Sequence, residues 1–279
     1  MSASFRYAMC NEAFEGRPFG EVCRILHRLG YQGIEIAPFT LAPDPLEVAA
    51  SARREYRRIM ADEGLGYVGL HWLLVTPKTV HVTTPDRALR ESSWQYVRNL
   101  VDLSADLGDN SIMVLGSPKQ RSTTGGISPA EAKRHLIDGL ASVAPHAEQR
   151  GVTILMEALP RSQSDVVNTL AEAVEVVREI DSPAIRTMFD CHNAEDETEP
   201  HDRVVEKYYE YIRHVHVNEM DGNHPGTGNY DFVSLFRALD RLNYPGWVSL
   251  ESFDFAVGGE TIASETIEYL KIQEEKARQ

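Results

Sequence analysis

The chain has 279 residues, of which 42% are hydrophobic and 25% are charged, and its formal net charge is -14. This composition is typical of a globular protein with a large hydrophobic core. The acidic balance argues against nucleic acid as a partner, because phosphate binding requires clustered Lys and Arg. The sequence contains no run of about 18 apolar residues, so we expect no membrane span and no membrane partner.

The cysteines and the N-terminus bear on the location of the protein. Cys10, Cys23 and Cys191 are an odd number at wide spacings, which indicates neither a disulfide framework nor a zinc knuckle. The N-terminal segment lacks the basic start and the long apolar run of a signal peptide. The expected location is therefore the reducing cytoplasm.

Short apolar segments alternate with longer amphipathic segments along the chain. Several short segments are rich in Val and Ile without strict polar alternation, as expected for strands buried on both faces of a parallel sheet. They predict eight strands, at Phe5–Met9, Gly33–Ile36, Tyr67–His71, Ser111–Leu115, Val152–Glu157, Arg186–Asp190, His214–Val217 and Val248–Glu251. The segments between them predict helices, for example at Leu46–Glu63, Arg87–Leu107, Pro129–Gln149, Leu170–Ile180 and Phe232–Leu242.

Local signals mark the ends of several predicted helices. Ser128 precedes Pro129 and has Glu131 three positions further on, which predicts a capping box with Pro at the first helical position. Asp231 is a candidate N-cap for the helix that follows it. A glycine follows four of the helical segments as a stop signal, at Gly30, Gly64, Gly108 and Gly151.

Repeated strand–helix units over the whole length predict one (β/α)8 barrel, a single TIM-barrel domain that spans residues 1–279. The alternative is an open doubly wound sheet, which usually carries a glycine-rich phosphate-binding loop after an early strand. The first predicted strand instead runs into Cys10-Asn11-Glu12, without a G-x-G-x-x-G motif. The barrel is therefore the preferred interpretation.

Each of the last four predicted strands carries an acidic or imidazole side chain at or near its end. These are Glu157, Asp190, His216 and Glu251, at intervals of 33, 26 and 35 residues. Each interval is about one βα unit long, so the four side chains should lie side by side on the C-terminal rim, where barrel enzymes have their active sites. A single Glu there is usually solvated and a single His structural, but four in consecutive strands indicate a shared site.

Three carboxylates in one place repel one another, and their pKa values rise unless a cation neutralises them. Glu157, Asp190, His216 and Glu251 therefore predict a site for one divalent metal ion per chain. Mn²⁺ is the expected ion, and the donor types also suit Mg²⁺, Co²⁺ or Zn²⁺. In His214-Val215-His216, alternation places both imidazoles on the same side of the strand. His216 is nearer the C-terminal end and is the expected ligand, with His214 in a lower layer.

Short motifs occur in a characteristic order and spacing over essentially the whole chain. They are Gly33-Ile34-Glu35, Gly116-Ser117-Pro118, Met156-Glu157-Ala158-Leu159, Met188-Phe189-Asp190, His216-Val217-Asn218-Glu219, Pro225-Gly226-Thr227-Gly228 and Leu250-Glu251-Ser252. In these motifs the chain resembles the sugar phosphate isomerase/epimerase superfamily with a xylose-isomerase-like barrel. Its members include ketose 3-epimerases, hydroxypyruvate isomerases and inosose dehydratases.

The resemblance implies a reaction type. Glu157, Asp190, His216 and Glu251 match the metal set of the ketose epimerases, and in those relatives the two glutamates also move protons. The expected activity is isomerisation or epimerisation of a small sugar or keto-polyol by proton transfer next to a carbonyl, through a metal-stabilised enediolate. Relatives are often homodimers or homotetramers, which is the expected assembly.

Three positions depart from the ketose-epimerase pattern of substrate contacts. Gln163 stands where those enzymes have a second glutamate, and Gly222 stands where they have an arginine. After the metal aspartate they have a histidine at the third position, whereas this chain has His192 at the second and Asn193 at the third. Either the loop is one residue shorter or Asn193 takes the histidine's role.

Other candidate substrate contacts follow strands or lie in loops. His71 and Trp72 end the third predicted strand, and Trp72 is either a wall for a sugar ring or part of the core. Lys119, in Lys119-Gln120-Arg121, could hold a phosphate or carboxylate, or belong to a solvated basic turn. His224 could enter the pocket when its loop closes.

Three other functions remain open. A metal-dependent lyase that dehydrates a keto-inositol or a 3-keto sugar would begin with the same proton abstraction. A DNA-repair endonuclease of the AP-endonuclease type would need a multi-metal cluster and a basic face, which the charge of -14 disfavours. A non-catalytic sugar-binding subunit would not need both proton-transfer glutamates.

Overall fold

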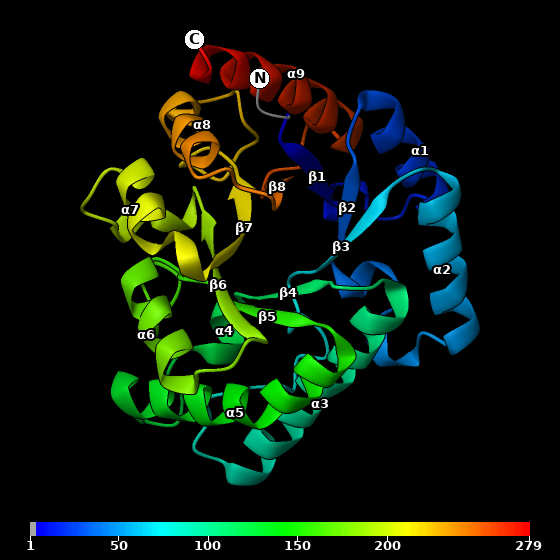
Figure 1. Ribbon diagram of the computed structural model, residues 1–279. Helices are drawn as coiled ribbons and strands as arrows, with labels where there is room; N and C mark the ends of the chain where they lie inside the picture. The colour runs from blue at the N-terminus through cyan, green and yellow to red at the C-terminus, as the bar shows by residue number, and fades with distance from the viewer. Residues whose placement is uncertain (1–3) are drawn as a thin grey trace.

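Eight parallel strands close into a barrel in the order β1-β2-β3-β4-β5-β6-β7-β8, because β1 pairs with both β2 and β8. This computed structural model describes residues 4–279. Residues 1–3 lie outside that range. They belong to the N-terminal segment in which we expect no signal peptide. The helices form an outer ring around the strands (Figure 1). The predicted fold class is confirmed.

Every predicted strand corresponds to a strand of the barrel. The strands are β1 Arg6–Cys10, β2 Gly33–Ile36, β3 Gly66–Leu70, β4 Ile112–Leu115, β5 Thr153–Met156, β6 Ile185–Asp190, β7 Ile212–Val217 and β8 Trp247–Leu250. The α-helices are α1 Phe19–Leu29, α2 Ala50–Asp62, α3 Arg87–Leu107, α4 Pro118–Arg121, α5 Pro129–Arg150, α6 Leu170–Ile180, α7 His201–Tyr208, α8 Phe232–Arg241 and α9 Gly259–Ala277. Short 3-10 turns occur at η1 Asn11–Phe14, η2 Pro38–Thr40, η3 Pro45–Glu47, η4 Asn193–Asp196 and η5 Tyr209–Tyr211.

One predicted helix boundary is wrong, and two predicted caps are present. The helix predicted from Leu46 begins at Ala50, because η3 forms a separate turn capped by Asp44 and the chain is extended at Val48. The side chain of Ser128 accepts a hydrogen bond from the backbone N–H of Glu131 at 3.2 Å. The Asp231 carboxylate likewise caps α8. Gly30, Gly64 and Gly151 have positive φ angles, whereas Gly108 is extended at 179°.

Alternation along the strands fills the barrel interior in layers. Residues of one face, Ala8, Leu155 and Met188 among them, form a small apolar cluster against Trp247. Cys10, Glu157 and Asp190 follow Ala8, Leu155 and Met188 by two positions each. They therefore lie on the same face, nearer the C-terminal rim. The other face of the sheet packs against the helices in a large hydrophobic cluster. The sequence period therefore places polar groups at one end of the barrel and apolar groups below them.

None of the described helices combines the length and the apolar character needed to cross a bilayer.

We expect Ser128→Ala to lower the free energy of unfolding by about 1 kcal/mol, because the substitution removes the N-cap acceptor of α5. Urea unfolding measures the change. Ser92→Ala in α3 is the matched control, because Ser92 is also exposed but lies inside its helix. An equal loss of stability in both variants would contradict the capping role.

Candidate functional site

The structure brings the four predicted metal ligands together. Glu157 directly follows β5, Asp190 ends β6, His216 lies in β7 and Glu251 directly follows β8. One potential ligand atom of each residue lies within 4.8 Å of those of the others, and all four residues are buried. Because β5 to β8 are consecutive neighbours in the barrel, their C-terminal ends meet at one part of the rim.

Neighbouring side chains hold these groups in place. Asn193 donates from Nδ2 to Oε1 of Glu157 at 2.9 Å. Trp72 donates from Nε1 to Oε1 of Glu251 at 2.6 Å. Nδ1 of His216 lies 3.0 Å from Oε2 of Glu251 and 3.5 Å from Oδ2 of Asp190. Each glutamate thus has one oxygen fixed by a neutral donor.

The crowded carboxylates disturb one another's protonation. Burial, and then the charges of Asp190 and Glu251, raise the pKa of Glu157 to about 8. Burial also raises the pKa of Glu251. Burial alone would lower the pKa of His216, but the charges of Glu35 and Glu251 raise it well above its ordinary value. Without a cation, the surroundings therefore favour the protonated forms of Glu157 and His216. A metal ion bound between the four side chains would replace these protons.

The backbone around the site adopts uncommon conformations. A Cβ at Gly116 would lie 2.1 Å from Oε2 of Glu157, so only glycine leaves room for that carboxylate. Trp72 has a φ of 52° and Ser117 has a φ of 49°, in the left-handed region that bulky residues rarely adopt. Such strain concentrates at functional sites, where the surrounding structure enforces it.

The prediction of a solvated basic turn at Lys119-Gln120-Arg121 is wrong for Arg121. Its side chain is fully buried, with Nη1 donating to the carbonyl oxygen of Glu157 at 2.7 Å and Nη2 donating to that of Val167 at 3.3 Å. Burial lowers the pKa of Arg121 to about 10. The guanidinium therefore places a positive charge beside Glu157 and ties α4 to the segment that follows β5.

A pocket of about 720 Å³ opens beside the cluster. Both Glu157 and Glu251 line it, so their carboxylates are accessible to a ligand although the residues are buried. Four of the predicted substrate-binding residues also line it, namely Trp72, Lys119, Gln163 and Asn193. Phe253 completes one wall, with its ring stacked on that of Trp72 at a centroid distance of 6.0 Å. Trp72 is therefore a wall of the pocket.

The structure places three predicted substrate contacts elsewhere. His71 is fully buried and pairs with Glu12 at 2.7 Å, outside the pocket lining. His224 pairs with Glu265 of α9 at 3.0 Å and is 6% exposed, so it faces the outer helix. His192 stands behind the lining, with its ring against Phe253 at 5.1 Å. Strand position alone could not show where these imidazoles point.

The departures from the ketose-epimerase pattern have structural causes. Gly222 has a φ of 83°, and a Cβ there would lie 2.8 Å from the ring of Phe253, so an arginine does not fit. Gln163 donates from Nε2 to Oδ1 of Asn193 at 3.1 Å. Asn193 in turn contacts Glu157, so it is the residue of this loop that reaches the cluster.

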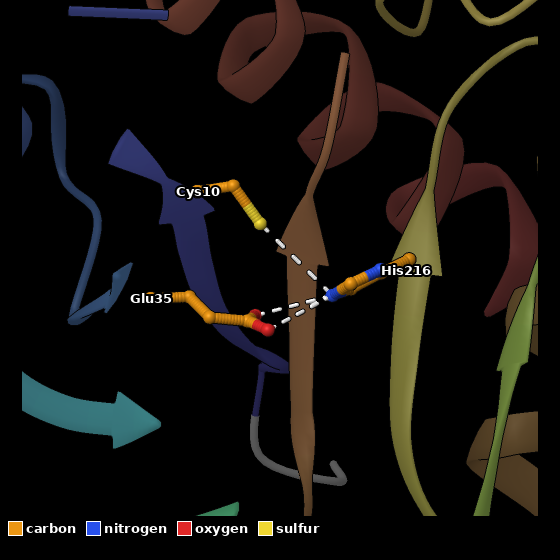
Figure 2. A group of neighbouring side chains, drawn as sticks. All are labelled: Cys10, Glu35 and His216. Carbon is orange, nitrogen blue, oxygen red and sulfur yellow. Dashed lines mark hydrogen bonds and ion pairs between the residues drawn. The ribbon is translucent and has the colours of Figure 1, made fainter. Parts of the chain in front are cut away.

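A second group of polar side chains lies inside the barrel and was missed by the site prediction. It contains Cys10, Glu12, Glu35, His71 and His214, all of them buried. Figure 2 shows Cys10 and Glu35 directed toward His216 from β1 and β2. Glu35 belongs to the Gly33-Ile34-Glu35 motif, which was the one available signal in the sequence. His214, which was expected below His216 on the strand, belongs to this group through its contact with Glu35 at 2.9 Å.

Comparisons with known proteins extend over most of the chain. The family described as "Xylose isomerase-like TIM barrel" matches residues 23–273. A ketose 3-epimerase of Arthrobacter globiformis is 26% identical over 181 residues, which is 63% of this chain and 61% of that enzyme. That alignment thus spans less than two thirds of the relative's length.

Two further matches cover more of both proteins. An L-ribulose 3-epimerase of Mesorhizobium japonicum is 26% identical over 250 residues, which is 88% of this chain and 80% of that enzyme. A solved structure of L-ribulose 3-epimerase superposes with a TM-score of 0.84 at 20% identity and covers 99% of this chain and 96% of its own. At this identity the structural likeness shows the shared barrel fold.

The raised pKa of Glu157 predicts how the metal-free protein responds to pH. From its ordinary value of 4.5 up to about 8, the folded protein keeps a proton on Glu157 that the unfolded chain releases. Glu157 therefore contributes a fall in the free energy of unfolding as pH rises through this range, by about 1.4 kcal/mol per pH unit. Glu157→Gln should flatten this fall when unfolding is followed from pH 5 to 9 with a chelator present.

Glu148→Gln, at an exposed position of α5, is the control for that experiment and should keep the wild-type slope. Identical slopes for Glu157→Gln and the wild type would contradict the raised pKa.

Proposed function

The chain belongs to the xylose isomerase-like TIM barrel family, and on that premise we propose that it is a divalent-metal-dependent sugar epimerase. The reaction moves a proton at a carbon next to a carbonyl group. The relatives named ketose 3-epimerase and L-ribulose 3-epimerase support this reaction type. The observation that carries the proposal is the pair Glu157 and Glu251, which face one pocket and share a donor cluster with Asp190 and His216.

The donor cluster fits a divalent ion. Three carboxylates and one imidazole, buried together, supply oxygen and nitrogen ligands and an excess of negative charge. Glu157, Asp190, His216 and Glu251 would hold the ion, with Mn²⁺ as the expected metal. When bound, such an ion supplies Lewis-acid stabilisation of the negative charge that develops on substrate oxygens.

The two glutamates divide the proton transfer between them. One takes a proton from the substrate carbon and the other returns it on the opposite face, so both must reach the same space. Trp72 holds Oε1 of Glu251 and Asn193 holds Oε1 of Glu157, which restricts each carboxylate to one orientation. Fixed orientation lowers the barrier, because less freedom is lost on reaching the transition state.

The pocket supports a polyhydroxy carbonyl substrate. Its volume of about 720 Å³ lies in the range of pockets that hold small-molecule ligands. Trp72 and Phe253 offer a flat apolar wall, while Gln163 and Asn193 offer amide groups for hydroxyls. Lys78 and Lys119 line the pocket too, and neither forms an ion pair with a residue in the range 4–279. We assign Trp72, Lys119, Gln163 and Asn193 to substrate binding.

Dehydration remains the alternative reaction, because a lyase acting on a keto-inositol or a 3-keto sugar would use the same proton abstraction. The absence of the ketose-epimerase arginine at Gly222 favours testing such substrates beside free ketoses. Two further expectations stay predictions. They are a cytoplasmic location, which the unpaired cysteines suit, and assembly as a homodimer or homotetramer.

Incubation in D₂O with Mn²⁺ tests the reaction. We expect deuterium from the solvent to be incorporated at the carbon next to the carbonyl of a ketose or a 3-keto sugar, without loss of water. NMR measures this incorporation. Glu157→Gln and Glu251→Gln should each reduce this exchange by at least about 100-fold, because each removes a proton-transfer group. Loss of water from the substrate would establish the lyase instead, and exchange that survives both substitutions would refute the mechanism.

Trp72→Phe separates the two roles of Trp72. The ring wall persists, but Glu251 loses its indole donor, and a hydrogen bond to a charged group contributes about 1.5–3 kcal/mol. We expect kcat to fall by about 10-fold or more with a smaller change in KM, measured by steady-state kinetics. The control is Trp94→Phe, which removes a buried indole in α3 that donates to the carbonyl oxygen of Val82. A rise in KM alone would show that Trp72 only contacts the substrate.

A further inference from the structure

Glu35 lies across the barrel from the metal ligand His216. Glu35 is on β2 and His216 is on β7, and the strands β1 and β8 stand between them in the sheet. Both side chains have 0% exposure and point toward each other inside the barrel (Figure 2). Glu35 is outside the pocket lining, so it does not meet the substrate.

The two ring nitrogens of His216 face different partners. Nδ1 faces the rim carboxylates, at 3.0 Å from Glu251. Nε2 faces Glu35, at 3.1 Å from Oε1 and 3.2 Å from Oε2. An ionised carboxylate only accepts hydrogen bonds, so Nε2 must carry a hydrogen. When a metal ion replaces the hydrogen on Nδ1, the neutral imidazole has its lone pair on that atom, which faces the carboxylates of Glu251 and Asp190.

We propose that Glu35 is a positioning residue that fixes the tautomer and the ring orientation in which Nδ1 of His216 binds the metal ion. This inference rests on the proposed function, since it assigns a role toward the same ion. Partners of this kind orient imidazole ligands and increase their basicity. Glu35 therefore acts on the ion only through His216.

Glu35 is itself held in place. Nε2 of His214 lies 2.9 Å from Oε2 of Glu35, so two histidines of one strand share a single carboxylate. Nδ1 of His71 lies 3.8 Å from Oε1 on another side. The hydrogen bond with His214 holds the Glu35 carboxylate beside β7, so the carboxylate favours one orientation of the His216 ring. Both histidines of β7 therefore contact the same carboxylate.

The group Cys10, Glu35 and His216 could instead be a second ion site, because its potential ligand atoms lie within 4.8 Å of one another. The contacts favour hydrogen bonding. Nε2 of His216 is within hydrogen-bonding distance of both Glu35 oxygens, while Sγ of Cys10 is more distant at 4.0 Å. Sγ of Cys10 also lies 3.8 Å from Oγ of Ser249, which offers it another partner. The number of ions bound per chain separates the two arrangements.

Glu35→Gln tests the proposal on the full chain. The amide is nearly isosteric, but it is neutral, and its NH₂ group can face Nε2 and force the hydrogen onto Nδ1. We expect Mn²⁺ affinity, measured by competition with a chelator, to fall by about 10- to 100-fold. Glu12→Gln is the matched control and should keep wild-type affinity, because Glu12 is also a buried glutamate paired with a histidine but contacts His71 instead.

Nitrogen-15 NMR of the histidines provides a second measurement that needs no variant. With Zn²⁺ as the diamagnetic probe, the wild type should show Nε2 of His216 protonated and Nδ1 shifted by the metal. A metal-shifted Nε2, or unchanged Mn²⁺ affinity in Glu35→Gln, would overturn the proposal. Two ions per chain, with one lost in Glu35→Gln, would establish the inner ion site in its place. A wild type that binds no ion would instead refute the proposed function.

Discussion

The carboxylates of Glu157, Asp190 and Glu251 share one buried space, and their mutual repulsion must be compensated wherever this chain folds. Two cationic groups of the protein partly compensate this repulsion. The imidazole of His216 lies among the carboxylates, and the guanidinium of Arg121 is buried beside Glu157. A divalent ion would complete the balance, so the same charges that cost stability in its absence define where it binds.

The barrel makes this concentration of charge possible. Consecutive parallel strands end at one rim, so residues far apart in the chain converge there without long loops. Below the rim, alternation places Leu155 under Glu157 and Met188 under Asp190, which supplies the apolar floor. Glu35 on β2 is in register with Cys10 on β1 and also points into the barrel. The polar interior thus contacts His216 on the side away from Glu251.

The rim loops contain the unusual backbone conformations and the positions that depart from the ketose-epimerase pattern. Trp72 adopts a positive φ angle and donates to Glu251, while Gly116 leaves space for the Glu157 carboxylate. The same loops differ from the ketose-epimerase pattern at Gln163 and Gly222. The donor cluster therefore matches the ketose-epimerase pattern, whereas the residues around it differ from that pattern.

The sequence by itself determined the barrel and the position of the donor cluster, because both follow from local periodicity. Buried strands repeat once per βα unit, and a side chain at a strand end must reach the rim. It could not determine which way each polar side chain points, because that depends on contacts across the barrel. Only the tertiary structure placed His71 and His224 outside the pocket, buried Arg121 beside Glu157, and joined Glu35 on β2 to His216 on β7. Those pairings link residues tens to hundreds of positions apart, and no spacing rule along the chain encodes them.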